Sequence, residues 1–218
     1  MMMIQENVYL FRPLQETGPG VLVLHAWWGF NNFIRSFCDR LAGEGYITLA
    51  PDLYHGEIAT TIPEAEKLRK KTRKSSIEVD VLKAANTLLN LPEIQGSPIG
   101  VIGFSLGAYW SLWLTEQEDI PVSLAIFFYG TRRGDYTKSH TAFLGHFAEH
   151  DPYESASGIA ALKRSLVKAG KEVDFYTYPG TGHWFLESDR IESFNQNAAD
   201  LAWERSIDKL HKYLSTKH

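Results

Sequence analysis

Short apolar runs, each followed by a helical pattern, constrain the fold of this chain more than any other feature. The apolar runs rich in branched and aromatic residues predict strands over 20–26, 46–52, 98–104, 122–130, 141–151 and 172–180. The segments between them predict helices over 31–45, 63–92, 106–117, 155–169 and about 195–214, with a bend near Ser75 and Ser76. Strands that alternate with helices form a mostly parallel sheet with helices on both faces. The predicted fold class is therefore α/β, in a single domain over 1–218.

A Gly-x-Ser-x-Gly pattern lies where one of these strands passes into a helix. The chain reads Gly103, Phe104, Ser105, Leu106, Gly107, between the strand at 98–104 and the helix at 106–117. The pentapeptide alone is weak evidence, because it also occurs by chance as a glycine-rich turn. At a strand-to-helix junction it is typical of a nucleophile elbow, in which the serine hydroxyl projects above the carboxyl edge of the sheet. Ser105 is therefore the predicted nucleophile.

A serine hydroxyl needs a base and an acid to become a nucleophile, and on such a scaffold they follow in the order acid, histidine. Of the eight histidines, His183 lies in the glycine-rich loop "YPGTGHWF", directly after the last predicted strand. Asp151 ends the strand at 141–151 and precedes Pro152. Glu149 is the rival carboxylate, but we expect it to lie within that strand. The predicted catalytic triad is Ser105, Asp151 and His183.

The loop "LHAWWGFNNFIR", after the first predicted strand, is the expected source of a second oxyanion donor. We predict that the oxyanion hole consists of the backbone N–H groups of Trp27 and Leu106. Trp28 and Trp184 are predicted to bind substrate, because open α/β sheets bind ligands at the carboxyl ends of their strands. The alternative for the adjacent tryptophans is a place in the core, which is their commoner position.

These segments resemble the dienelactone hydrolase family, and the resemblance covers nearly the whole chain. "LHAWWGFNNFIRSFCDRLAGEGYITLAPDLYHG" is similar to the segment around the family's first strand. "GVIGFSLGA", "GHFAEHDPY" and "YPGTGHWF" are similar to the family's three catalytic segments, in the same order. The resemblance implies the α/β-hydrolase fold, with the same triad and the same backbone oxyanion donors.

Three positions depart from that family's pattern. The named dienelactone hydrolases use cysteine where this chain has Ser105, a glutamate where it has Ala26, and a substrate-binding arginine where it has Glu187. We therefore expect a carboxylic ester hydrolase, a serine esterase or lactonase that forms an acyl-serine intermediate. Glu187 is expected to repel anionic substrates, so the expected substrate is a small, uncharged ester or lactone with an apolar part.

Other activities stay open at this point. A thioesterase, a peptidase or an acyltransferase could use the same triad, because all of them transfer an acyl group to serine. A non-catalytic binding protein on the hydrolase fold is a further alternative.

Composition limits the partners and the compartment. The formal net charge is −4, which does not favour nucleic acid, and the basic run at 67–74 is typical of a solvated helix face. Cys38 is the only cysteine, so we expect no intrachain disulfide, and no metal or cofactor is predicted. The first residues lack the pattern of a signal peptide, and no apolar run is long enough to span a bilayer. The prediction is a cytoplasmic monomer or homodimer that acts on a small molecule.

Overall fold

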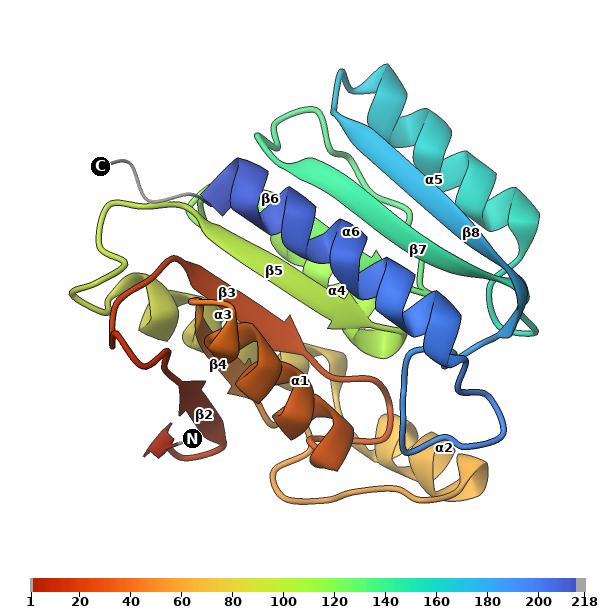
Figure 1. Cartoon of the computed structure of the whole chain (residues 1–218), viewed down its shortest axis with the longest axis horizontal. Helices are drawn as coiled ribbons and strands as arrows, with labels where there is room; N and C mark the ends of the chain where they lie inside the picture. The colour runs from red at the N-terminus through yellow and green to blue at the C-terminus, as the bar shows by residue number, and fades with distance from the viewer. Residues whose placement is uncertain (1, 215–218) are drawn as a thin grey trace.

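The computed structural model describes residues 2–214, and Figure 1 shows the whole chain. The strands are β1 (Met2–Gln5), β2 (Val8–Phe11), β3 (Gly20–Leu24), β4 (Ile47–Pro51), β5 (Ile99–Phe104), β6 (Val122–Phe128), β7 (Ala142–His150) and β8 (Val173–Gly182). The helices are α1 (Asn32–Gly43), α2 (Ile62–Lys71), α3 (Lys74–Leu89), α4 (Leu106–Leu114), α5 (Ala156–Lys168) and α6 (Gln196–Leu214).

All eight strands form one sheet, in the order β1-β2-β4-β3-β5-β6-β7-β8. The six strands from β4 to β8 in this order run parallel, and only β1 and β2 are antiparallel to their neighbours. Every residue of β3, β4 and β5 is buried, as expected for parallel strands that are covered on both faces. The predicted α/β class is confirmed.

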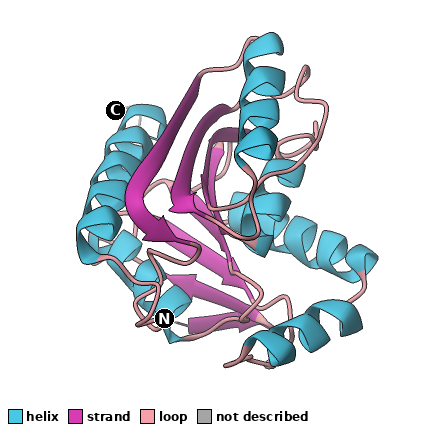
Figure 2. Ribbon diagram, turned by 90° about the vertical axis from the view of Figure 1, so that its right-hand side faces the viewer, coloured by secondary structure: helices cyan, strands magenta, loops and turns pink. Residues whose placement is uncertain are grey.

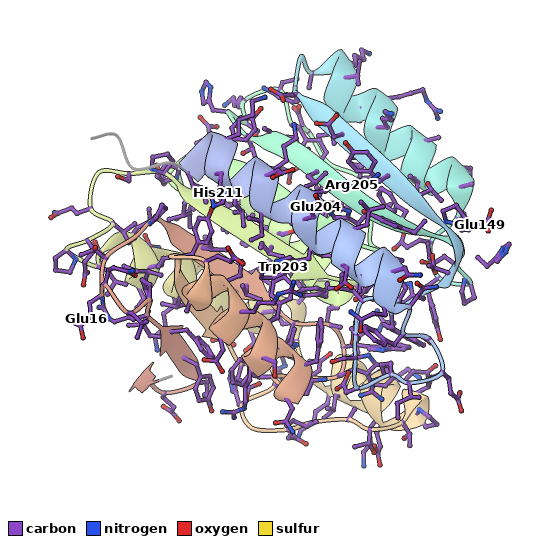
Figure 3. All side chains as sticks on the ribbon, in the orientation of Figure 1. Glu16, Glu149, Trp203, Glu204, Arg205 and His211 are labelled. Carbon is purple, nitrogen blue, oxygen red and sulfur yellow. The ribbon has the colours of Figure 1, made fainter. Side chains whose placement is uncertain are left out.

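The helices form two layers around the sheet (Figure 2). α1 and α6 cover one face, where they pack on β4 and on β5 to β7, and α3, α4 and α5 cover the other. On the first face, Phe37 of α1 meets Trp203 of α6 edge to face, with ring centroids 5.2 Å apart. Figure 3 shows Trp203 between these two helices. Among the described helices, none is long and apolar enough to cross a membrane.

Two parts of the chain differ from the expectation. The hairpin of β1 and β2 was not predicted, because two strands of four residues are too short to show a period. The helix expected over 63–92 is two helices, and the break lies at Thr72 and Arg73 instead of Ser75 and Ser76. Both residues have extended backbone, with ψ angles of 121° and 140°, which no helix can contain.

The parallel strands bring the site together at one edge of the sheet. β3, β5, β6, β7 and β8 all end at the edge that lies at the lower right of Figure 1. The loops that follow them therefore meet there, although they are far apart in the sequence. The loop between β8 and α6 closes over this edge beside the start of α2, where Arg190 donates a hydrogen bond to the carbonyl oxygen of Thr60 (3.0 Å).

Candidate active site

Ser105 lies on a strained turn between β5 and α4. Its φ is +49°, a left-handed conformation that few residues other than glycine adopt. Gly103 and Gly107 allow the tight turn, because a Cβ on Gly103 would collide with the carbonyl of Gly107. A Cβ on Gly107 would in turn collide with the carbonyl of Leu24, at the end of β3. The elbow is thus pressed against the neighbouring strand, and the serine side chain remains only half-buried.

The three residues of the predicted triad form a continuous hydrogen-bonded chain. The Oγ of Ser105 lies 2.9 Å from Nε2 of His183, and Nδ1 of His183 lies 2.7 Å from Oδ2 of Asp151. The side chains of His183 and Asp151 are 3% and 2% exposed, so little water competes for these bonds. A carboxylate can only accept, so Nδ1 carries the proton and Nε2 presents its lone pair to the serine hydroxyl. This is the arrangement that a general base for serine requires.

The carboxylate of Asp151 is fixed by its own loop. Its other oxygen, Oδ1, accepts hydrogen bonds from the backbone N–H groups of Tyr153 (2.8 Å) and Glu154 (3.0 Å). Glu149, the rival acid, lies within β7 as expected, and its carboxylate accepts from the N–H of Gly180 at 2.8 Å. Figure 3 shows Glu149 at the outer rim of the molecule. The structure therefore brings Asp151, and not Glu149, to the histidine.

The two predicted oxyanion donors belong to neighbouring segments. Leu106 is the first residue of α4, and Trp27 is the second residue of a β-turn closed by a 3.3 Å bond from the N–H of Gly29 to the carbonyl of Ala26. Within residues 2–214, neither the Trp27 N–H nor the Leu106 N–H has a hydrogen-bond acceptor. The helix N-terminus adds a partial positive charge at the same place.

The rings of Trp184 and Tyr153 lie against His183, and the rings of Trp27 and Trp28 lie against Trp184. The ring of Trp184 lies 4.9 Å from His183, 5.1 Å from Trp28 and 6.1 Å from Trp27. The ring of Tyr153 lies 4.8 Å from His183, 5.5 Å from Trp27 and 5.3 Å from Trp184. We call Trp27, Tyr153 and Trp184 the aromatic shelf.

The aromatic residues at the site differ from the expectation at two positions. Trp28 is only 2% exposed, and the guanidinium of Arg190 covers its ring at 3.7 Å. The predicted substrate contact of Trp28 is therefore replaced by a supporting position beside Trp184. Tyr153 is 47% exposed and was missed, since the sequence signal there pointed only to Asp151 two residues earlier.

The carboxyl group of Glu187 is buried and does not present a negative charge to the site. It is 1% exposed and accepts a 2.8 Å hydrogen bond from the hydroxyl of Tyr129, whose ring lies 4.9 Å from His183. Burial raises the pKa of Glu187 to about 8, so the carboxyl group is mostly protonated at neutral pH. The expectation that Glu187 repels anionic substrates is therefore wrong: the side chain is sealed below the site and mostly neutral.

Three of the six basic residues in the segment 67–74 form ion pairs with carboxylates. Lys70 and Lys74 form ion pairs with glutamates one helical turn away, Glu66 (3.3 Å) and Glu78 (3.6 Å). Lys71 pairs with Glu57, in the loop before α2.

In the described part of the chain, no cluster of three or more histidine, cysteine or acidic side chains could hold a metal ion.

A nucleophile elbow on a parallel sheet, with the acid and the histidine after later strands, defines an α/β-hydrolase. The model of the dienelactone hydrolase family matches residues 7–214, so the chain belongs to that family. It is a carboxylic ester hydrolase, and the enzyme class expected from the sequence is confirmed.

Relatives of known name have the same extent as this chain. A protein of Saccharolobus solfataricus named as a carboxymethylenebutenolidase is 30% identical, and the alignment covers 85% of this chain and 86% of the relative. One of Aquifex aeolicus with the same name is 27% identical and covers 90% and 89%. A dienelactone hydrolase-like promiscuous phosphotriesterase from metagenomic libraries superposes with a TM-score of 0.83 at 18% identity, covering 95% of this chain and 92% of that one. The last likeness supports the fold.

Proposed function

We propose that the protein hydrolyses a small ester or lactone, with Ser105 as nucleophile, His183 as base and Asp151 as the group that orients the base. The observation that carries this proposal is the unbroken chain of hydrogen bonds from Ser105 Oγ to Asp151 at 2.9 and 2.7 Å. The names of the two relatives, which describe an activity on a butenolide, support a lactone among the candidate substrates.

The reaction proceeds in two acyl transfers. Ser105 Oγ bonds to the carbonyl carbon while its proton passes to Nε2 of His183, and the carbonyl oxygen becomes an oxyanion. The N–H groups of Trp27 and Leu106 donate to that oxygen. The C–O bond then breaks, and His183 gives the proton to the departing alkoxide, which in a lactone stays attached to the acyl chain. Water, deprotonated by His183, then attacks the acyl-serine; the bond to Ser105 Oγ breaks, His183 returns the proton to Oγ, and the carboxylic acid is released.

The aromatic shelf favours substrates with a flat apolar part. Trp184 is half-buried and Tyr153 is largely open, so a planar group beside the scissile carbonyl can pack on their rings. Each such contact contributes about 0.5–1.5 kcal/mol beyond area burial. We therefore propose Trp27, Tyr153 and Trp184 as the substrate-binding side chains, with Trp28 in support.

We further propose a cytoplasmic enzyme with one domain over 1–218, active as a monomer or homodimer and without nucleic acid or membrane partners. The buried, unpaired thiol of Cys38 and the ion pairs of Lys70, Lys71 and Lys74 in the basic segment support this assignment.

Active-site labelling tests the proposal. A fluorophosphonate should modify the wild-type protein on the peptide that contains Ser105, and Ser105→Ala should abolish both labelling and ester hydrolysis. Ser206→Ala is a matched control, because Ser206 also lies beside a histidine but is 1% exposed. Hydrolysis that survives Ser105→Ala would contradict the proposal. A panel of esters, thioesters, amides and acyl acceptors then separates the esterase from the thioesterase, peptidase and acyltransferase alternatives.

A further inference from the structure

We propose that His25 is a positioning residue: its Nδ1–H holds the Ala26–Trp27 peptide in the orientation that presents the Trp27 N–H to the substrate oxygen. The inference rests on the proposed function, because it assumes that the Trp27 N–H is an oxyanion donor.

Both ring nitrogens of His25 are committed to backbone groups. The side chain is completely buried, directly after β3. Its Nδ1 lies 2.6 Å from the carbonyl oxygen of Ala26, and its Nε2 lies 3.0 Å from the backbone nitrogen of Leu53. A carbonyl can only accept and an N–H can only donate, so Nδ1 carries the proton and Nε2 is the acceptor.

The neutral ring suits this arrangement. Burial lowers the pKa of His25, because a charged imidazolium loses its hydration in the core. The carboxylate of Asp52 approaches Nε2 only to 3.9 Å, and its oxygens accept from the N–H groups of Tyr54 (3.0 Å) and Gly56 (2.6 Å). His25 therefore acts through two neutral hydrogen bonds.

The hydrogen bond to Ala26 orients the next N–H because a peptide group is planar. In a trans peptide, the carbonyl of Ala26 and the N–H of Trp27 point in opposite directions. The carbonyl accepts from His25 on the core side and from Gly29 inside the turn (3.3 Å). The Trp27 N–H consequently points away from both, and it has no acceptor within the described residues.

The same backbone lies against the nucleophile elbow. A Cβ on Gly107 would lie 2.7 Å from the carbonyl oxygen of His25, so the start of α4 touches the residue that makes these contacts. A rotation of the Ala26–Trp27 peptide would change the direction of the Trp27 N–H relative to the start of α4, against which this backbone lies. Loss of one oxyanion donor lowers kcat by about 10²–10³.

Two substitutions separate the two hydrogen bonds of His25. In His25→Asn, the amide nitrogen has the position of Nδ1 and can still donate to Ala26. In His25→Gln, the amide oxygen has the position of Nε2 and can still accept from Leu53, but the donor to Ala26 is lost. Both variants lose the ring, so each serves as the packing control for the other. We expect kcat for an aryl ester to be at least about tenfold lower in His25→Gln than in His25→Asn, with KM changed less than about threefold.

Equal kcat values in two folded variants would overturn the inference and leave His25 a structural residue. A measurement on the wild-type protein does not depend on the folding of either variant. Two-dimensional ¹H–¹⁵N spectra of the imidazole should show Nδ1 protonated and Nε2 bare, and the opposite tautomer would overturn the inference as well. Ser105→Ala, assayed in parallel, separates the proposed function from the role of His25. If Ser105→Ala keeps hydrolytic activity, the proposed function fails. If Ser105→Ala is inactive and the two His25 variants have equal kcat values, only the role of His25 is removed.

Discussion

The protein contains two serine–histidine arrangements with nearly the same distances, at the carboxyl edge and in the core. At the edge, His183 joins Ser105 (2.9 Å) to Asp151 (2.7 Å). In the core, Nε2 of His146 lies 3.1 Å from Oγ of Ser206 on α6, and its Nδ1 lies 2.7 Å from the hydroxyl of Tyr178 on β8. Spacing alone does not distinguish the two.

The two arrangements differ in which atom donates each hydrogen bond. Ser206 donates its hydroxyl proton to the carbonyl of Ala202 at 2.7 Å, so it accepts from the Nε2–H of His146. Nδ1 of His146 then accepts from the hydroxyl of Tyr178. In the core, therefore, the serine faces an N–H and has no base, whereas at the edge a carboxylate holds the proton on Nδ1 and turns the lone pair of Nε2 toward the serine. A carboxylate partner, rather than a second hydrogen bond as such, makes the arrangement fit for catalysis.

One residue lies between the two arrangements. The backbone N–H of Tyr129 donates to the carbonyl of His146 at 2.7 Å, while its ring lies 4.9 Å from His183. Its hydroxyl donates to Glu187. Tyr129 therefore links the proposed base, His183, to the buried network of His146.

The largest expected effect comes from the Nδ1 partners of the two histidines. Asp151→Asn should lower kcat by about 10³–10⁴, because an amide nitrogen beside Nδ1 favours the wrong tautomer of His183. Tyr178→Phe should leave kcat unchanged and lower the free energy of unfolding by about 1–3 kcal/mol, since it leaves a buried nitrogen without a partner. Steady-state kinetics and urea unfolding on both variants check this contrast.

Glu149→Gln is the control for the acid. Its carboxylate accepts from the exposed Gly180 N–H and lies 3.4 Å from the exposed imidazole of His150, so activity should stay near wild type. A severe loss in Glu149→Gln together with a mild one in Asp151→Asn would mean that the wrong carboxylate has been assigned.

The sequence predicts more of the edge than of the core. Ser105, Asp151 and His183 each follow a readable strand, and parallel strands must end at one edge, so local patterns suffice to bring them together. The network of His146 depends on which strand and helix pack against it, and nothing near position 146 indicates Tyr178 or Ser206. For Glu187 the charge can be read from the sequence, but its burial cannot, and burial decides that the group is mostly neutral. Tyr153 was missed for the same reason, because its place on the shelf follows from the path of the loop after β7.

The ionisation state of Glu187, the carboxyl group that accepts from the Tyr129 hydroxyl, can be tested through the pH dependence of stability. Its pKa is raised from 4.5 to about 8 by burial, so the folded state holds the proton more tightly than the unfolded chain. The stability that this provides is complete below pH about 4.5 and is lost as pH rises through about 8. Between pH 5 and 8 the free energy of unfolding of wild type should therefore fall more steeply than that of Glu187→Gln, by up to about 1.4 kcal/mol per pH unit. Parallel slopes for the two proteins, measured by chemical denaturation, would show that Glu187 is already ionised in the folded state.

The core network responds to acid. Burial lowers the pKa of His146 from 6.5 to about 3, so the folded state excludes a proton that the unfolded chain binds. Its contribution is complete above pH about 6.5 and is lost as pH falls toward about 3. From pH 6.5 to 5 the loss amounts to about 2 kcal/mol. His146→Gln should lack this component, so its free energy of unfolding should change less over that interval than that of wild type. An identical change in both proteins would place the acid sensitivity elsewhere.

The smallest expected effect comes from the exposed aromatic surface at the carboxyl edge of the sheet, which the buried network of His146 lacks. Tyr153 is 47% exposed, and its ring lies 5.3 Å from Trp184, so a planar alcohol or acyl group can pack against it. Removing the ring in Tyr153→Ala should lower kcat/KM for an aromatic ester relative to an aliphatic one by about five- to tenfold, which corresponds to about 1 kcal/mol of lost contact. Tyr153→Phe should retain the preference, and Val167→Ala, at a 58% exposed position on α5, controls for surface truncation. If Tyr153→Ala lowers both esters equally, the ring acts by holding His183, 4.8 Å away, and not by contacting the substrate.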